Sequence, residues 1–106
     1  MSETTLEQFA AALADGATVI DVREPSEYVG GHVPGAALMP MSRLTSLLDE
    51  LDRSRPLYVI CQSGNRSGAM SDFLVRAGFD ARSVAGGTSG WAASGRPVVT
   101  GPRPTA

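Results

Sequence analysis

The single cysteine of the chain, Cys61, stands where its thiol could act as a nucleophile. It directly follows an apolar run at residues 57–60, and six small or polar residues at 62–67 separate it from an apolar pattern of helical spacing. A strand that ends in a cysteine, a short polar loop and the start of a helix form an arrangement suited to covalent chemistry on sulfur.

The loop after Cys61 has the composition of an anion-binding cup. Gly64 and Asn65 are the residue types that best tolerate positive φ, so the chain can curl and point successive N–H groups inward. A helix beginning at about Ser67 adds the positive end of its dipole, and Arg66 adds a permanent cation. Both effects lower the pKa of a nearby thiol. We therefore predict a reactive thiolate in a cup that binds anions.

Two reactions use such a cup, and a plain core cysteine is the alternative to both. A core cysteine does not need six small or polar residues and a helix N-terminus after it. Cysteine phosphatases hold a phosphoryl group above the thiolate, whereas sulfurtransferases hold a persulfide on it. Cys61 and Arg66 are five positions apart, which makes a six-residue loop. A phosphoryl group with three equatorial oxygens needs a wider cup than one sulfane sulfur.

Composition excludes several other chemistries. All nine basic residues among the 106 are arginines, which excludes imine chemistry and a P-loop lysine. One cysteine and one histidine cannot form an internal disulfide or a Cys/His zinc site, so we expect no metal and no cofactor. The net charge of −2 predicts no nucleic-acid or membrane partner. The polar start MSETT lacks the pattern of a signal peptide, and we expect a cytoplasmic protein with a reduced thiol.

Strand-like and helix-like segments alternate along the chain. Apolar, β-branched runs predict strands at 18–22, 36–38, 57–60 and 81–84. Apolar residues at helical spacing predict helices at 5–15 with a Thr4–Glu7 capping box, at about 26–28, from Ser42 with the apolar face Leu44, Leu47, Leu48 and Leu51, from about 67 to 77, and around Trp91. We predict an α/β domain with a mainly parallel sheet, followed from Arg96 by an extended, frayed tail.

Ligands of parallel sheets bind beyond the carboxyl ends of the strands, and Cys61 lies at such an end. Asp21 and Arg23 follow another strand at the same edge of the sheet. They would support the pocket or, more simply, form an ion pair or a turn cap. His32 invites a general-base role, but we interpret it as a structural hydrogen-bonding residue.

Three segments of the chain together resemble the rhodanese family in its single-domain form. The loop CQSGNRS at 61–67 resembles the active-site loop of the family. The segments DVREPSEY at 21–28 and GHVPGA at 31–36 are similar to its upstream signature, and Gly86-Gly87 with Trp91 is similar to the pattern near its C-terminus. These segments occur in the family's order and span residues 21–91.

The resemblance implies a three-layer α/β/α fold with a central sheet of about five strands. We expect one domain over residues 1–106, with a core at about 4–97 and an extended, proline-containing tail at 98–106. In His32, Glu27, Tyr28 and Trp91 we expect structural roles.

The resemblance also implies a sulfurtransferase. A donor such as thiosulfate or a persulfide would load Cys61 as a persulfide, and cyanide or a thiol would accept the sulfur. The binding loop would comprise Gln62, Ser63, Gly64, Asn65, Arg66 and Ser67. A sulfur-carrier or regulatory module that serves one protein acceptor is the alternative. Phosphatase relatives have a loop one residue longer, so six residues favour sulfur over phosphate.

Overall fold

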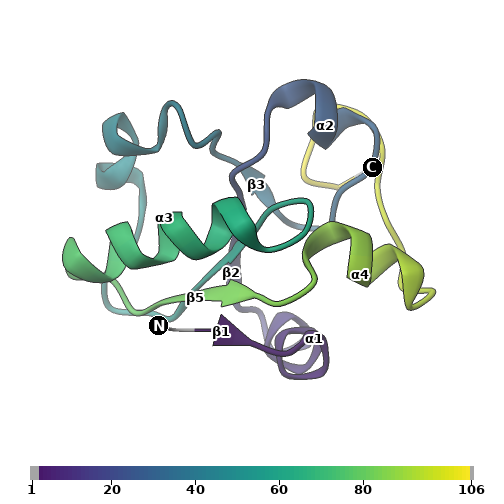
Figure 1. Ribbon diagram of the computed structural model, residues 1–106, viewed down its shortest axis with the longest axis horizontal. Coiled ribbons are helices and arrows are strands. Elements are labelled where there is room, and N and C mark those ends of the chain that lie inside the picture. The colour runs from purple at the N-terminus through teal and green to yellow at the C-terminus, as the bar shows by residue number, and fades with distance from the viewer. Residues whose placement is uncertain (1–2, 106) are drawn as a thin grey trace.

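The computed structural model describes residues 3–105. Its centre is a five-stranded sheet, with helices packed around it (Figure 1). The strands are β1 (Glu3–Thr4), β2 (Thr18–Asp21), β3 (Ala37–Leu38), β4 (Leu57–Ile60) and β5 (Ala81–Val84). Their order across the sheet is β1-β5-β4-β2-β3, and every neighbouring pair is parallel. The predicted α/β fold is confirmed. Strand β1 adds to the four strands that the local patterns predict, and with it the sheet has the five strands that the resemblance implies.

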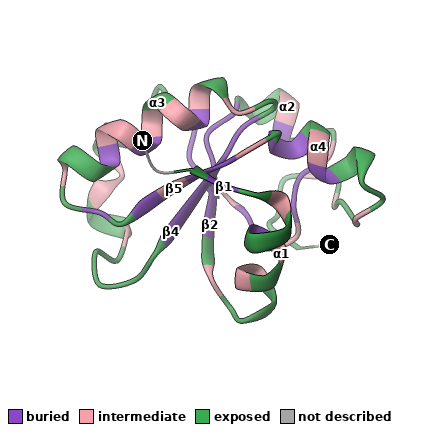
Figure 2. Ribbon diagram, turned by 60° about the horizontal axis from the view of Figure 1, so that its bottom comes forward, coloured by how far each residue is buried: buried purple, intermediate pink, exposed green. Residues whose placement is uncertain are grey.

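Helices lie on both faces of the sheet, with α3 (Asn65–Arg76) on one side and α1 (Leu6–Ala14) on the other (Figure 2). Successive side chains of a strand point to opposite faces. In β4, Leu57 and Val59 pack in the core beneath α3, whereas Tyr58 and Ile60 pack in the core beneath α1. Because Cys61 continues this alternation, its side chain lies on the α3 side of the sheet.

Two predicted helix details are wrong. The capping box of α1 is formed by Thr5 and Gln8, because Thr4 already pairs with Val84 in the sheet. The segment after Ser42 is not an α-helix but two 3₁₀ turns, η1 (Leu44–Ser46) and η2 (Leu48–Glu50).

A competing hydrogen bond accounts for the first of these turns, η1. The Ser46 hydroxyl donates to the Arg43 carbonyl at 2.8 Å, and the backbone N–H of Ser46 donates to the same oxygen at 3.0 Å. Such local side-chain bonds compete with regular helical hydrogen bonding. The predicted apolar face is nonetheless correct, since Leu44 is buried and three further leucines pack against the same core: Leu47, Leu48 and Leu51.

Two short helices, α2 (Pro25–Val29) and α4 (Gly87–Ala93), flank the carboxyl edge of the sheet. The tail after Arg96 is held against this region rather than frayed. Val99 exchanges two backbone hydrogen bonds with His32, and the Gly101 N–H donates to the Val29 carbonyl. Along residues 3–105, no helix has both the length and the apolar composition needed to cross a bilayer.

Candidate active site at the Cys61 loop

The Cys61 loop, residues 61–67, follows β4 at the point where the chain reverses its direction across the sheet. β4 pairs with β2 on one side and β5 on the other, while the chain leaves β2 toward β3 and leaves β4 toward β5. The carboxyl edge at such a switch point is the usual ligand site of a parallel sheet. The β2–β4 register sets Asp21 opposite Ile60, so the residues after both strands meet here.

The sulfur of Cys61 is almost completely enclosed, with 1% of the residue exposed. The backbone N–H of Gly64 donates to Sγ at 3.1 Å, and Sγ lies 3.4 Å from the Ser67 hydroxyl. Burial raises the pKa of the Cys61 thiol. The Ser67 hydroxyl and the backbone N–H groups of Ser67, Gly64 and Ser63 outweigh burial, so the pKa lies below its usual range. The predicted low-pKa thiol is therefore present.

One residue of the Cys61 loop has a positive φ, where two were expected. Gly64 has φ +114° and is the N-cap of α3, as expected for a glycine at this point. Asn65, expected to share the positive φ, is instead the first residue of α3. The helix thus begins two residues earlier than predicted, and its N-terminal end lies closer to the sulfur, where it favours negative charge.

A buried pair of serines lies beneath the sulfur. The Ser67 hydroxyl is 2.8 Å from the hydroxyl of Ser83 on β5 and 3.1 Å from the Gly64 carbonyl oxygen. Both serines are essentially unexposed. Ser83 was not predicted; it stands in register with Val59 of the apolar strand β4, a pairing that no local pattern reveals.

Replacing Ser67 with alanine is expected to raise the pKa of Cys61, because the thiolate loses its side-chain donor. A hydrogen bond to a charged group is worth about 1.5 kcal/mol or more, so alkylation of Cys61 by iodoacetamide at pH 7 should slow about tenfold. The midpoint of the rate against pH should move upward. Ser63→Ala is the control, because Ser63 acts on the sulfur through its backbone N–H, and an unchanged midpoint in Ser67→Ala would contradict the assignment.

The N-terminus of α4 fixes the outer side of the loop. The backbone N–H and the hydroxyl of Thr88 donate to the Cys61 carbonyl at 2.8 and 3.0 Å, and the Ser89 N–H donates to the Gln62 carbonyl at 3.0 Å. A Cβ at Gly87 would lie 2.6 Å from that Gln62 oxygen, so only glycine permits this approach. With these carbonyls directed toward α4, the N–H groups of the loop remain available to the sulfur.

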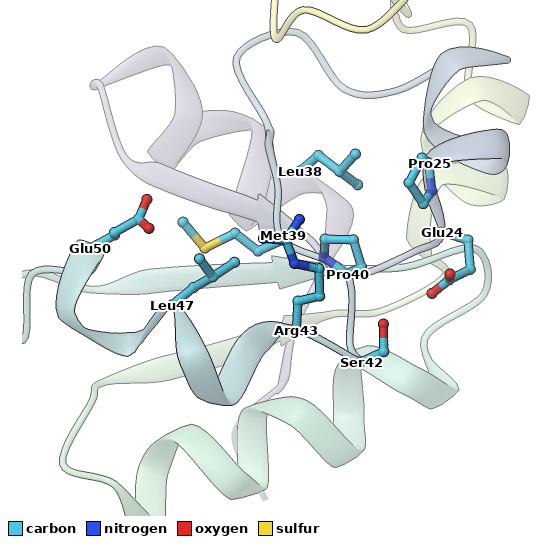
Figure 3. Close-up of a pocket in the computed structure, with 9 residues that line it drawn as sticks. All are labelled: Glu24, Pro25, Leu38, Met39, Pro40, Ser42, Arg43, Leu47 and Glu50. Carbon is cyan, nitrogen blue, oxygen red and sulfur yellow. The ribbon is translucent and has the colours of Figure 1, made fainter.

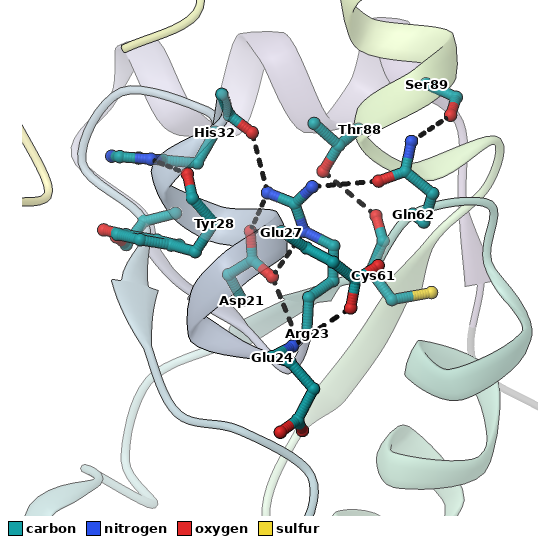
Figure 4. Close-up of polar contacts among 12 residues, drawn as sticks. Asp21, Arg23, Glu24, Glu27, Tyr28, His32, Cys61, Gln62, Thr88 and Ser89 are labelled. Carbon is teal, nitrogen blue, oxygen red and sulfur yellow. Dashed lines mark hydrogen bonds and ion pairs between the residues drawn. The ribbon is translucent and has the colours of Figure 1, made fainter. Parts of the chain in front are cut away.

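The Gln62 side chain links the loop to Arg23 and Ser89 by hydrogen bonds and does not point into the cup (Figure 4). Its amide oxygen accepts from Nη1 of Arg23 at 2.9 Å, and its amide nitrogen donates to the Ser89 hydroxyl at 2.6 Å. Arg23 also donates to both carboxylate oxygens of Asp21 at 2.9 to 3.1 Å and to the Gly31 carbonyl. The predicted ion pair of Asp21 and Arg23 is confirmed, and it braces the loop through Gln62.

The guanidinium group of Arg66 is paired with a carboxylate. Its Nη1 and Nη2 donate to the two carboxylate oxygens of Glu27, each at 2.8 Å. The charge of Arg66 does interact with Cys61. The larger contributions to the lowered pKa of the thiol, however, come from the hydrogen bonds of Ser67 and of the backbone N–H groups. Glu27, expected to be structural, is a direct partner of the loop.

The remaining predicted residues have the structural contacts expected of them. His32 is buried, with Nδ1 2.8 Å from the Tyr28 carbonyl and Nε2 2.7 Å from the Arg103 carbonyl. Trp91 packs in the core beneath α1 and donates to the Pro97 carbonyl. Residues 3–105 hold no cluster of three or more His, Cys, Asp or Glu side chains fit for a metal ion.

Two cavities flank α2, and Cys61 lines neither. One, of about 350 Å³, lies beyond β3 between Pro25, Met39, Pro40 and Leu47 (Figure 3). The other, of about 290 Å³, lies between α2, Gln62, α4 and the tail, with Glu27, Gly31, Ser89 and Val98 in its wall.

Comparison with known proteins agrees with this geometry. The Bacillus subtilis (strain 168) protein YqhL is 40% identical over 78 residues, which are 74% of this chain but only 61% of that protein. The crystal structure of a rhodanese-related protein from Thermoplasma volcanium superposes with a TM-score of 0.89 at 33% identity, over 95% of this chain and 100% of that one. Reduced Bacillus anthracis CoADR-RHD contains a similar fold (TM-score 0.78, 28% identity) that covers 82% of this chain and 16% of the longer one.

The sequence profile of the family described as Rhodanese-like domain matches residues 5–94, which include the whole Cys61 loop and every strand from β2 to β5. This family is of sulfurtransferase and sulfur-carrier type, in keeping with an enclosed cysteine whose pKa is lowered. The chain therefore belongs to the rhodanese-like domain family.

Proposed function

We propose that this protein is a sulfurtransferase that carries sulfane sulfur on Cys61. The observation that supports the proposal most directly is the sulfur itself, which is enclosed and contacts the Gly64 N–H and the Ser67 hydroxyl. These donors favour a negative charge at Sγ, both on the thiolate that attacks and on the persulfide that forms.

The reaction has two steps. The Cys61 thiolate attacks the outer sulfur of a donor such as thiosulfate or an organic persulfide, a new S–S bond forms, and sulfite or a thiolate leaves with the electron pair of the broken bond. A thiophile, cyanide or a thiol, then attacks the outer sulfur of the Cys61 persulfide and releases the thiolate. Dividing one transfer into two easier displacements is the advantage of a covalent intermediate. Because the thiol has to be reduced, we place the reaction in the cytoplasm.

Incubation with a sulfur donor is expected to increase the mass of the intact protein by one sulfur atom, and a thiol reductant should remove the increase. The measurement is intact-protein mass spectrometry before and after donor and reductant, with peptide mapping to Cys61. If thiosulfate, mercaptopyruvate and a persulfide all leave the mass unchanged, the proposal is wrong.

A sulfur carrier dedicated to one protein acceptor is the second candidate. The similar fold in CoADR-RHD makes up only 16% of that longer chain, so a domain of this kind occurs as one part of a larger protein. A carrier would load Cys61 equally well but would release sulfur slowly to cyanide and small thiols. Rates of unloading by these acceptors separate the two candidates. Phosphatase chemistry is disfavoured by the six-residue loop, and hydrolysis of an aryl phosphate would revive it.

A further inference from the structure

Two guanidinium groups flank the Cys61 loop, and each is already paired with a carboxylate. Arg23 pairs with Asp21, and Arg66 forms a two-pronged contact with Glu27, with both N···O distances 2.8 Å. Bidentate contacts of this kind are the strongest class of charge-assisted hydrogen bond. The four charges sum to zero, so these side chains add no net positive charge where a donor anion approaches.

The Glu27–Arg66 pair is stable and reachable from solvent. The hydrogen bonds from Arg66 outweigh burial and, with the Glu24 N–H, hold the pKa of Glu27 at about 2. A lowered carboxyl pKa means that the pairing is complete above its usual value and is lost only as the pH falls through about 2. The side chains of Arg66 and Glu27 are 34% and 31% exposed, so dissolved ions can reach the pair, and the charge of Arg66 interacts with Cys61.

Sulfane donors differ in the charge that they bring to the sulfur. Thiosulfate is a dianion. When the Cys61 thiolate attacks it, three negative charges come together, and the products are the Cys61 persulfide anion and the sulfite dianion. A persulfide anion RSS⁻ carries one negative charge. When the Cys61 thiolate attacks it, only two negative charges come together, and the products are the Cys61 persulfide anion and the thiolate RS⁻. The neutral donors at Sγ, an N–H and a hydroxyl, suit the reaction of lower charge better.

A cavity lies next to the Cys61 loop and shares Gln62 with it, although Cys61 itself does not line the cavity. The cavity of about 290 Å³ is bounded by Glu27, Gln62, Ser89 and Val98, and it has room for the carbon chain of a thiol. Thiosulfate has no such group to place there.

We propose that Glu27 sets donor selectivity: by holding Arg66, it makes Cys61 accept sulfur from monoanionic organic persulfides in preference to dianionic thiosulfate. The inference rests on the proposed function and names the donor class of the same site. Glu27 is a positioning residue in this account, because it acts through the charge of Arg66.

The test is the second-order rate constant for loading Cys61, followed by mass, with sodium thiosulfate and with 2-hydroxyethyl persulfide. The wild-type protein should load faster from the persulfide. In Glu27→Gln the amide oxygen can still accept a hydrogen bond from the Glu24 N–H, but the positive charge of Arg66 is no longer neutralised by a carboxylate. We expect the ratio of the thiosulfate rate constant to the persulfide rate constant to rise about tenfold. The thiosulfate rate constant should also decrease more steeply with added salt than in the wild type.

Two further variants separate charge from structure. Glu24→Gln removes the same charge from the exposed end of the same helix without contacting Arg66, and its rate ratio should stay within about twofold of wild type. Glu27→Gln/Arg66→Gln removes both members of the pair and should return the ratio to near the wild-type value. A wild type that prefers thiosulfate, or a ratio that Glu27→Gln leaves unchanged, overturns the inference while the proposed function stands. No loading from either donor overturns both.

Discussion

Replacing Cys61 with serine is expected to abolish sulfur loading while the fold persists. A hydroxyl is a far weaker nucleophile than a thiolate, and loss of the nucleophile lowers rates on the order of 10³-fold or more. No other cysteine is present to take its place. Loading is followed by the mass increase of one sulfur, and turnover by the formation of thiocyanate from cyanide.

The fold of the serine variant should be preserved because serine fits the same space. Its hydroxyl can accept from the Gly64 N–H and contact Ser67 as the thiol does. Circular dichroism and the urea midpoint should therefore stay close to wild type. Retained loading in a folded variant would place the nucleophile elsewhere.

The largest loss of stability is expected from Gly87→Ala. Gly87 has φ +59°, where a side chain costs about 1–2 kcal/mol, and its Cβ would lie 2.6 Å from the Gln62 carbonyl oxygen and 2.7 Å from that of Cys61. Forcing the added Cβ into packed space costs about 1–3 kcal/mol more. We therefore expect the free energy of unfolding to fall by about 3 kcal/mol in total. Because the displaced atoms belong to the Cys61 loop, the loading rate should fall as well.

Gly16→Ala is the matched control for this variant. Gly16 has φ +87°, but an added Cβ would meet no atom within 4 Å. It should lose only the backbone contribution, about 1 kcal/mol, with no change in the loading rate. Equal losses of stability in both variants, measured by urea unfolding, would show that the close approach of α4 to the loop has no energetic importance.

The parts of the structure that could be predicted are those with local signals. The β4 run is apolar throughout, and the loop after it combines a glycine with small polar residues, so the cup and its lowered thiol pKa follow from neighbouring residues. The apolar face at 44–51 was also predicted correctly, but its 3₁₀ geometry was not; the first turn carries the Ser46 hydroxyl bond to the Arg43 carbonyl, which the apolar pattern does not reveal.

The parts that could not be predicted depend on residues far apart in the chain. Glu27 and Arg66 are separated by 39 positions, and no periodicity links them. Their pairing changes the interpretation of the site, because the sequence alone makes Arg66 the principal cation of the cup. Likewise, Thr4 is removed from the α1 cap by its pairing with β5, a contact that no local pattern reveals.

The Ser67 hydroxyl lets the site change its charge without moving its backbone. This hydroxyl has three possible acceptors within reach: the Gly64 carbonyl, Ser83 and the Cys61 sulfur. When Cys61 is a thiol, its S–H donates to Ser67, whose own hydrogen turns to one of the other two. When Cys61 is ionised, a rotation about one C–O bond directs that hydrogen to the sulfur. A torsional rotor of this kind reorients much faster than a loop moves, so the cup stays preorganised through the cycle of sulfur loading and release.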